Sequence, residues 1–259
     1  MVDIHSHILF GIDDGPIEIE ESIDMIRQAV SVGYTDIVCS SHYLIGRFEN
    51  LNYDKNFEIL KNRILEEKIP LNIHKGNEFA LDPEFSTHEN RINKMAGSRY
   101  ILVELKDELI YGACKSFFKN VIAKGYIPIF AHVERYPHIK VQEFRELVDM
   151  GVVLQMNIRM AVNPIPKAKY LLENGYISII ATDSHRMGRR DYNIDEYLKK
   201  LESSLGRELF QVLMEENPRK VIEDKEIVTE IKYEGDGDEE KKVNGIGSIF
   251  SNLFNKFFK

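Results

Sequence analysis

The sequence predicts an α/β fold, a single domain built as a barrel of parallel strands, and three observations support this class. Apolar, β-rich segments recur along the chain, and segments with helical spacing lie between them, which is the pattern of repeated βα units. Glycines stand where those helices should end. Histidines and carboxylates stand where several strands should end, as they do at the mouth of a barrel.

Seven strands are predicted from short apolar runs that lie between turn residues. They are residues 2–5, 35–40, 71–78, 100–105, 127–132, 152–157 and 177–182. The common barrel of this class has eight strands, so either one strand escapes this pattern or the barrel is distorted.

A helix is predicted over residues 18–32, where apolar residues at 19, 23, 26, 29 and 30 have helical spacing. It ends before Gly33, and a glycine in the left-handed conformation often closes a helix. Gly125, Gly151 and Gly175 are predicted to close later helices in the same way, because each precedes a strand within a few residues.

The βα pattern stops near Lys232, so residues 1–232 are predicted to form the folded domain. Residues 233–245 are polar, charged and glycine-bearing, which is typical of a flexible linker. Residues 246–259 are predicted to form an amphipathic C-terminal helix, with Lys256 and Lys259 on its polar side. This helix could dock on its own domain or on a second copy, or bind a membrane surface or a partner protein.

Composition argues against several classes of protein. The net charge of −8, from 34 Lys and Arg against 42 Asp and Glu, does not favour a nucleic acid partner. No apolar run of about 18 residues and no basic leader is seen, so we expect a soluble, cytoplasmic protein. Cys39 and Cys114 are too few for a disulfide framework and lie in apolar segments, so both are predicted to be buried.

Side chains that bind metals follow the predicted strands. His5 and His7 lie two residues apart, so they point to the same face of the first strand, and Asp13 and Asp14 follow in the first loop. The later candidates are His42, Glu78, Glu104, His132, Asp183 and His185. Buried charge is costly unless it is paired or bound to a metal, so a shared metal centre is predicted.

Imidazoles and carboxylates without thiolates suit Mn²⁺, Zn²⁺ or Fe²⁺, and this number of ligands is enough for two or three ions. Glu78 is the candidate bridging carboxylate, which would hold two cations so that a shared hydroxide becomes the nucleophile. The predicted catalytic residues are Glu78, His42 and Arg135.

Arginines near two of the strand ends indicate a phosphate substrate. Arg135 follows His132 by three residues, and Arg189 and Arg190 come soon after His185. A guanidinium group binds phosphate through two parallel hydrogen bonds, and a solvated surface arginine is the alternative for each. The sequence therefore predicts phosphoryl transfer.

Other residues of catalytic type are weaker candidates. A cysteine phosphatase loop of the form C-x5-R is absent, because the residues six positions after the two cysteines are Ile45 and Asn120. His74 and His88 are interpreted as core or surface histidines, whereas His138, in the loop after the fifth strand, could border the site.

These motifs resemble the polymerase and histidinol phosphatase (PHP) superfamily, and within it the bacterial manganese-dependent protein-tyrosine phosphatases of the CpsB/CapC/YwqE type. The resemblance extends from Met1 to about Lys225. The matching segments are DIHSHILFGIDDGP, SSHY, GNE, RYILVEL, PIFAHVERY, MGVVLQMN, ATDSH and ENPRKVI. Together these segments are specific, whereas the first His-x-His pair alone would not be.

The resemblance implies a distorted seven-stranded barrel, which agrees with the strand count, and a trinuclear metal site. The implied ligands are His5, His7, Asp14, His42, Glu78, Glu104, His132, Asp183 and His185. It also implies that Arg135 and one arginine after the last histidine contact phosphate. The chain departs from the family pattern at Phe79 and Ala80, so we expect the wall of the pocket to differ from that of the family. It also departs in offering both Arg189 and Arg190 for one role.

The resemblance further implies hydrolysis of phosphotyrosine by a metal-bridging hydroxide. The implied partner is the flexible phosphotyrosine-bearing tail of a bacterial tyrosine kinase that regulates capsule or exopolysaccharide synthesis. That would place the protein in the cytoplasm, or peripherally at the inner face of the membrane. A small-molecule phosphatase, such as a histidinol-phosphate phosphatase, is the alternative, and an inactive scaffold is disfavoured by the complete ligand set.

Overall fold

Parallel strands form the interior of the molecule, which the computed structural model describes over residues 1–105 and 110–231. One sheet has the order β1 (Val2–Ser6), β2 (Asp36–Cys39) and β4 (Asn72–Lys75). The other has the order β3 (His42–Tyr43), β5 (Glu78–Ala80), β6 (Tyr100–Glu104), β7 (Ile127–Phe130), β8 (Val153–Asn157) and β9 (Ile177–Ala181). All these pairings are parallel, as predicted for βα units.

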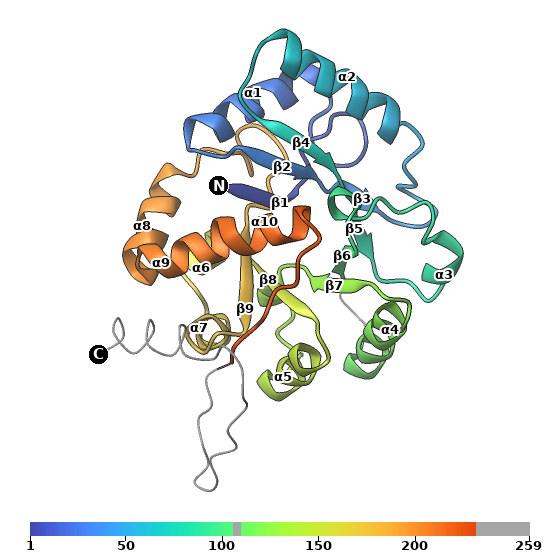
Figure 1. Ribbon diagram of the computed structural model, residues 1–259, viewed down its shortest axis with the longest axis vertical. Helices are drawn as coiled ribbons and strands as arrows, with labels where there is room; N and C mark the ends of the chain where they lie inside the picture. Colours follow the sequence, from blue (N-terminus) through green and yellow to red (C-terminus); the bar gives the residue numbers. More distant parts are fainter. Residues whose placement is uncertain (106–109, 232–259) are drawn as a thin grey trace, which may run out of the picture.

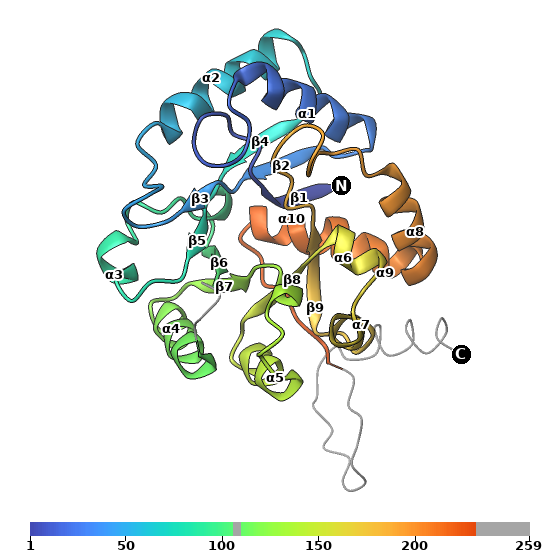
Figure 2. The same cartoon turned by 180° about the vertical axis from the view of Figure 1, so that it is seen from behind.

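Helices lie around the outside of the strands, as Figures 1 and 2 show. The longer helices are α1 (Ile19–Ser31), α2 (Tyr53–Glu66), α4 (Tyr111–Ala123), α5 (Val141–Asp149), α7 (Pro166–Glu173) and α8 (Asp195–Leu205). The shorter ones are α3 (Phe85–His88), α6 (Ile158–Val162), α9 (Arg207–Gln211) and α10 (Asn217–Ile222). Two 3-10 turns, η1 (Met95–Gly97) and η2 (Val133–Arg135), and a π-helical turn, η3 (Val212–Glu216), complete the described elements.

The predicted closing glycines are confirmed. Gly33, Gly125, Gly151 and Gly175 follow α1, α4, α5 and α7, and their φ angles are 94°, 85°, 95° and 76°. A residue with a side chain would be strained at these angles, so glycine allows each helix to turn sharply into the next strand. The helix predicted over residues 18–32 is α1, which begins and ends one residue inside those bounds.

The prediction of one unbroken strand over residues 71–78 was wrong, because β4 and β5 divide this segment between the two sheets. Gly76 marks the break, since a Cβ atom there would lie 2.5 Å from Cγ1 of Val38. The side-chain amide of Asn77 then donates to the backbone oxygen of Ser41 at 2.9 Å, which holds the crossing in place. A further short strand, β3, follows β2 after two residues.

A buried apolar cluster lies among the strands and extends to α10 and η1. It contains residues of β1, β2, β6, β7, β8 and β9, together with Met95 of η1 and Val221 of α10. The hydroxyl of Tyr100, at the start of β6, donates to the backbone oxygen of Lys225 at 2.7 Å. The amino end of β6 is thereby held to the chain after α10, and the carboxyl ends of the strands are left for a site.

The last described residues, up to Ile231, run along the same end of the strands. The hydroxyls of Thr229 and Ser178, near the start of β9, lie 2.5 Å apart. A Cβ atom on Gly175 would lie 2.3 Å from the backbone oxygen of Glu230, so this glycine also allows the chain to pass closely. The described chain therefore ends beside the amino end of β9.

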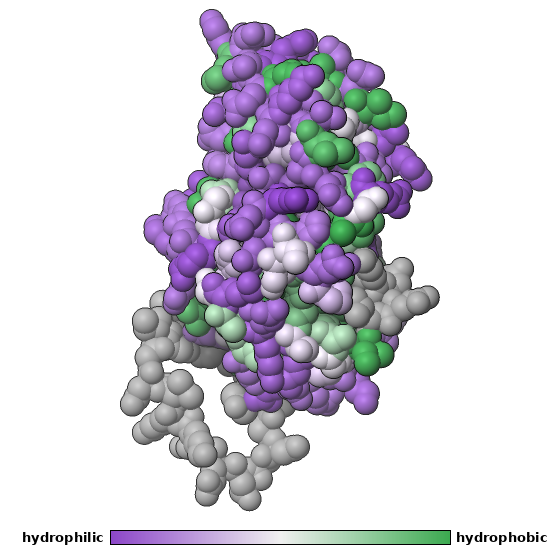
Figure 3. Space-filling view, turned by 90° about the vertical axis from the view of Figure 1, so that its right-hand side faces the viewer, coloured by the Kyte–Doolittle hydropathy of each residue, from purple (hydrophilic) through white to green (hydrophobic). Residues whose placement is uncertain are grey.

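The predicted linker at 233–245 and the predicted helix at 246–259 lie outside the described residues, as does residue 232. Within the described ranges, no helix is both long and apolar enough to cross a membrane. The face seen in Figure 3 is mainly polar, with small and separate apolar patches. Scattered apolar residues of this kind are normal on a protein surface.

A buried carboxylate, Asp3, ties β1 to the chain that follows β9. One of its oxygens accepts the backbone amides of His5 and Thr182, both at 3.2 Å. The other accepts the hydroxyl of Thr182 at 2.5 Å and that of Tyr192 at 2.7 Å. Burial raises the pKa of Asp3, and these donors oppose that effect. The chain on both sides of Asp183 is thereby held against the first strand.

The substitution Tyr192→Phe should lower the free energy of unfolding by about 2 kcal/mol, because it removes a hydrogen bond to a buried carboxylate. Urea unfolding at neutral pH measures this loss. The control is Tyr197→Phe, since Tyr197 packs its ring against Arg159 and phenylalanine keeps that ring. The control should stay within about 0.5 kcal/mol of the parent. Equal losses in the two variants would contradict the role of the Tyr192 hydroxyl.

Candidate metal centre

All nine residues predicted as metal ligands lie together at the carboxyl ends of the strands or in the loops that follow. Their ligand atoms form four groups, and within each group the atoms lie within 4.8 Å of one another. The groups are His7, Asp14, His42 and His185; His5, Glu78 and His132; His5, His7 and Asp183; and His42, Glu78 and Glu104. Because four residues belong to two groups each, the groups form one connected cluster.

Glu78 lies at the centre of this cluster. Its Oε1 is 2.8 Å from Nε2 of His132 and 3.3 Å from Nε2 of His5. Its Oε2 is 3.3 Å from Nε2 of His7 and 3.2 Å from Nδ1 of His42. Burial by itself would raise the pKa of Glu78, but the surrounding imidazoles hold it well below its ordinary value. Each oxygen faces a different pair of imidazoles, which suits a carboxylate that bridges two cations.

The loop after β1 brings two carboxylates to the cluster in different ways. The side chain of Asp14 is 58% exposed and lies at the edge. Asp13 is buried, and its Oδ2 lies 2.7 Å from Nδ1 of His7 and accepts the backbone amide of His42 at 2.8 Å. Gly15 lets the loop fold back on the strand, since a Cβ atom there would lie 2.1 Å from the backbone oxygen of His7. Asp13 therefore orients ligands from two strands.

Hydrogen bonds hold two of the imidazoles with Nε2 toward the cluster. Nδ1 of His7 faces the Asp13 carboxylate, and Nδ1 of His185 lies 2.9 Å from the backbone oxygen of Asp183. Both partners accept a hydrogen bond, so in the neutral ring Nδ1 carries the hydrogen and Nε2 is the nitrogen that can bind a cation. Burial and the neighbouring His7 lower the pKa of His185 to about 2, so its ring is neutral.

A buried carboxylate oxygen at the centre has no hydrogen-bond partner among the described residues. It is Oδ1 of Asp183, which lies 3.5 Å from Nε2 of His5 and 3.6 Å from Nε2 of His7. Such an oxygen is costly in the interior unless a cation lies beside it. Together with the mixed set of imidazoles and carboxylates, this oxygen fits a divalent metal ion.

The cluster is closed on one side and open on the other. The side chains of His5, His7, Glu78 and Asp183 are at most 1% exposed. At the edge, the side chains of His42 and Glu104 are 20% and 21% exposed. The cluster is therefore accessible from solvent past His42, Glu104 and Asp14.

Two arginines border the cluster by contacting Asp183. Arg135 donates to Oδ2 of Asp183, and Nη1 of Arg190 donates to the same oxygen at 2.7 Å. Arg189 is exposed, and within residues 1–105 and 110–231 its side chain makes no hydrogen bond or ion pair. The sequence left Arg189 and Arg190 as alternatives, and the structure brings Arg190 to the cluster.

Sequence reasoning missed the polar residues that support the ligands. Gln155 and Asn157 of β8 are buried beside the cluster, and the hydroxyl of Tyr136 lies 3.2 Å from Nδ1 of His132. The available signal was a strand, residues 152–157, that carries amides where buried apolar side chains are usual. Because amides are poor metal ligands beside imidazoles, this signal did not indicate a site.

The weaker histidine candidates lie outside the cluster. Nε2 of His74 is 3.0 Å from Oδ1 of Asp36, and Nδ1 of His88 is 2.9 Å from the hydroxyl of Tyr43. Both histidines thus have structural partners, as interpreted from the sequence. His138 is exposed and belongs to none of the four ligand groups.

Neither cysteine is placed for nucleophilic chemistry. Cys39 and Cys114 are both fully buried, as predicted. Burial raises the pKa of the Cys114 thiol to about 12 and that of the Cys39 thiol above its ordinary value. A thiol with a raised pKa is rarely a thiolate at neutral pH and is therefore a poor nucleophile.

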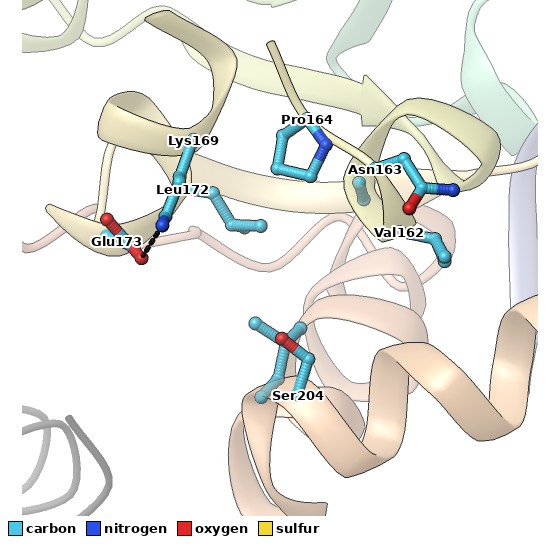
Figure 4. A pocket seen from close by; sticks show the side chains of 9 residues that line it. Val162, Asn163, Pro164, Lys169, Leu172, Glu173 and Ser204 are labelled. Carbon is cyan, nitrogen blue, oxygen red and sulfur yellow. Dashed lines mark ion pairs between the residues drawn. The ribbon is translucent and has the colours of Figure 1, made fainter. Parts of the chain in front are cut away.

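A hollow of about 470 Å³ lies apart from the cluster, where residues of α6, α7 and α8 meet (Figure 4). It is lined by Ala161, Val162, Asn163, Pro164, Lys169, Leu172, Glu173, Ser204 and Leu205. Its two charged side chains, Lys169 and Glu173, pair with each other at 3.7 Å. The hollow thus lacks the histidines and the surplus of carboxylates that characterise the cluster.

Comparison with curated proteins finds relatives along most of the chain. The chain is 30% identical over 240 residues to the tyrosine-protein phosphatase CpsB of Streptococcus pneumoniae, covering 86% of this chain and 99% of that protein. It is 29% identical over 226 residues to the tyrosine-protein phosphatase YwqE of Bacillus subtilis, covering 83% and 89%.

Solved structures and family models agree with these relatives. The chain matches a structure from work on YwqE of Bacillus subtilis and CpsB of Streptococcus pneumoniae, described as unique metal-dependent tyrosine phosphatases. That match has a TM-score of 0.79 and 27% identity, and covers 90% of this chain and all of that one. The model of the family described as "Capsular polysaccharide synthesis, CpsB/CapC" matches residues 1–223. Because this match includes every described strand and all nine clustered residues, the chain belongs to the CpsB/CapC family.

Proposed function

We propose that this protein is a metal-dependent protein-tyrosine phosphatase. The observation that carries the proposal is the cluster of nine histidines and carboxylates around Glu78, which is open to solvent on one side and bordered by two arginines. The names of its relatives, and the metal dependence ascribed to its structural relative, support the same activity.

In this proposal the nine clustered residues hold two or three Mn²⁺ ions, with Zn²⁺ or Fe²⁺ as alternatives. Glu78, whose two oxygens face different imidazoles, would hold two of these ions. Several imidazoles in the set favour Mn²⁺ over Mg²⁺, which prefers oxygen ligands. Divalent ions, when bound in such a site, polarise phosphoryl oxygens and lower the pKa of water.

Arg135 and Arg190 bind the phosphate in this proposal. Both guanidinium groups contact Oδ2 of Asp183, so they lie side by side next to the cluster. Their forked N–H donors match the oxygens of a phosphate and neutralise charge that develops during its transfer. His42, at the open edge between Glu78 and Glu104, completes the proposed catalytic set.

The leaving group favours phosphotyrosine. The phenol of tyrosine has a pKa of about 10, far below that of an aliphatic alcohol, so tyrosinate leaves with less help from an acid than a serine alkoxide does. The relatives' names are consistent with this preference. A tyrosine on the flexible tail of a bacterial kinase that controls capsule or exopolysaccharide synthesis is the substrate we propose, with hydrolysis in the cytoplasm.

We also propose that the two sheets close as a distorted barrel of seven βα units. At one junction the amide of Asp183 donates to the oxygen of His5, and the amide of His7 donates to the oxygen of Ser184, both at 2.8 Å. At the other, the amide of Glu78 donates to the oxygen of Ser40 at 3.0 Å. Bonds of this kind at both edges support a closed ring of strands.

Removal of metal should abolish the release of phosphate from a phosphotyrosine peptide. Added Mn²⁺ should restore the activity better than Mg²⁺, because the ligand set contains several imidazoles. The measurement is turnover before and after long incubation with a chelator, since buried ions can exchange slowly. Full turnover in excess chelator, in protein shown to contain no metal, would rule out the proposed centre.

Glu78→Gln should reduce kcat by about a hundredfold or more, because the bridging carboxylate loses its charge and one of its acceptor oxygens. The matched control is the double variant Cys39→Ser and Cys114→Ser, which should keep turnover within several-fold of the parent. Metal content and circular dichroism establish that both proteins are folded. A folded, metal-loaded double cysteine variant without activity would overturn the mechanism.

Arg135→Lys and Arg190→Lys should each lower kcat/KM by about tenfold or more, since lysine keeps the charge but loses the two parallel donors. Bound metal should stay unchanged. Arg189→Lys is the control, and we expect its kcat/KM to stay within about twofold of the parent because the side chain of Arg189 is exposed and pairs with none of the clustered residues. If Arg189→Lys is the damaging change of the three, the assignment of Arg190 is wrong.

A further inference from the structure

β8 is the strand of the second sheet that brings no histidine or carboxylate to the metal centre, and it brings two amides instead. Gln155 is fully buried and Asn157 is 8% exposed. Buried amides are expected to satisfy their donors and acceptors, because an unpaired polar group in the interior is costly. The partners of these two side chains therefore indicate what they do.

Three hydrogen bonds connect the two amides to three ligands of the centre, and a fourth connects the amides to each other. Oε1 of Gln155 accepts the backbone amide of His132 at 2.7 Å and lies 3.1 Å from Nδ1 of His5. Nε2 of Gln155 donates to Oδ1 of Asn157 at 3.0 Å. Nδ2 of Asn157 donates to Oδ2 of Asp183 at 2.9 Å. One ligand within β1 and two that follow β7 and β9 are thus linked through β8.

The direction of each of these four hydrogen bonds follows from one backbone group. The amide N–H of His132 can only donate, so the Gln155 atom that faces it must be the oxygen. The Gln155 nitrogen then faces Asn157, which must present its own oxygen there. The Asn157 nitrogen is left to face Asp183, whose carboxylate can only accept. No alternative orientation of either amide satisfies all four bonds.

This direction determines which atoms are free to bind a cation. Because Oε1 of Gln155 can only accept, the hydrogen of His5 lies on Nδ1, and its Nε2 faces the centre with a free lone pair. Because Oδ2 of Asp183 is occupied by Asn157 and the arginines, its unpartnered Oδ1 faces the same place. These two atoms lie 3.5 Å apart and belong to one ligand group.

The same series of hydrogen bonds holds two strained backbone positions. His132 has a φ of 33° and Asp183 a φ of 53°, both in the left-handed region that residues other than glycine seldom adopt. Such conformations persist where neighbouring groups hold them. Here the backbone of His132 and the side chain of Asp183 are each bonded to one of the two β8 amides.

We infer that Gln155 and Asn157 form an amide relay that positions His5, His132 and Asp183 for metal binding. The inference rests on the proposed metal centre. Both are positioning residues, since they act through the ligands and not on the substrate. Without the two amides every ligand residue is still present, but no hydrogen bond selects Nε2 of His5 or directs Oδ1 of Asp183 toward the cation.

The test uses Gln155→Met and Asn157→Leu, which keep the approximate volume and remove the hydrogen bonds. Calorimetric titration of the metal-free full-length protein with Mn²⁺ should show affinity about 10- to 100-fold weaker in each variant. In the double variant, the loss of binding free energy for Mn²⁺ should be smaller than the sum of the two single losses, because both changes break the same series of hydrogen bonds.

The matched control is Asn217→Leu, which removes a buried amide elsewhere. Nδ2 of Asn217 donates to the backbone oxygen of Ser178 at 2.9 Å, near the amino end of β9. This variant should lose stability to urea, as the relay variants do, but should keep its Mn²⁺ affinity within about twofold. Equal loss of affinity in Asn217→Leu would mean that general destabilisation explains the effect.

A measurement on the parent protein does not depend on the folding of any variant. Nitrogen NMR of the Zn²⁺-loaded parent should show His5 bound through Nε2 with its hydrogen on Nδ1. Coordination through Nδ1 would overturn the relay, as would Mn²⁺ affinity at the parent level in folded Gln155→Met. A parent protein that binds no divalent ion would instead refute the proposed metal centre.

Discussion

The charge of Glu78 is the constraint on which the rest of the structure depends. Its carboxylate is almost fully buried, so it must be stabilised by what surrounds it. The imidazoles of His5, His132 and His42 do so, and they come from three different βα units. The relative position of these units is therefore coupled to the charge of one side chain, so the packing of the units and the assembly of the site depend on each other.

Much of this site could be predicted because parallel strands bring their carboxyl ends to one place. The pattern of apolar runs located the strands. Histidines or carboxylates at the ends of six of the seven predicted strands, with Asp14 in the loop after the first, indicated the nine clustered residues without knowledge of any distance. The closing glycines were predictable for a similar reason, since the turn from helix to strand requires a positive φ. Local chemistry alone determines these features.

Features that depend on contacts between distant segments could not be predicted. The break at Gly76 follows from the approach of Val38, and nothing near residue 76 in the sequence records that approach. Arg190 and not Arg189 reaches Asp183 because the loop turns back, with the amide of His185 donating to the oxygen of Arg190. The buried amides of β8 were missed because their partners lie on other strands.

The last described residues lie on the side of the molecule opposite the cluster. The chain reaches Ile231 beside the amino end of β9, whereas the metal centre lies at the carboxyl end of the same strands. A strand of five residues separates those ends by roughly 17 Å. The described residues up to 231 therefore leave the fold on the side opposite the open edge of the cluster, and they leave that edge clear.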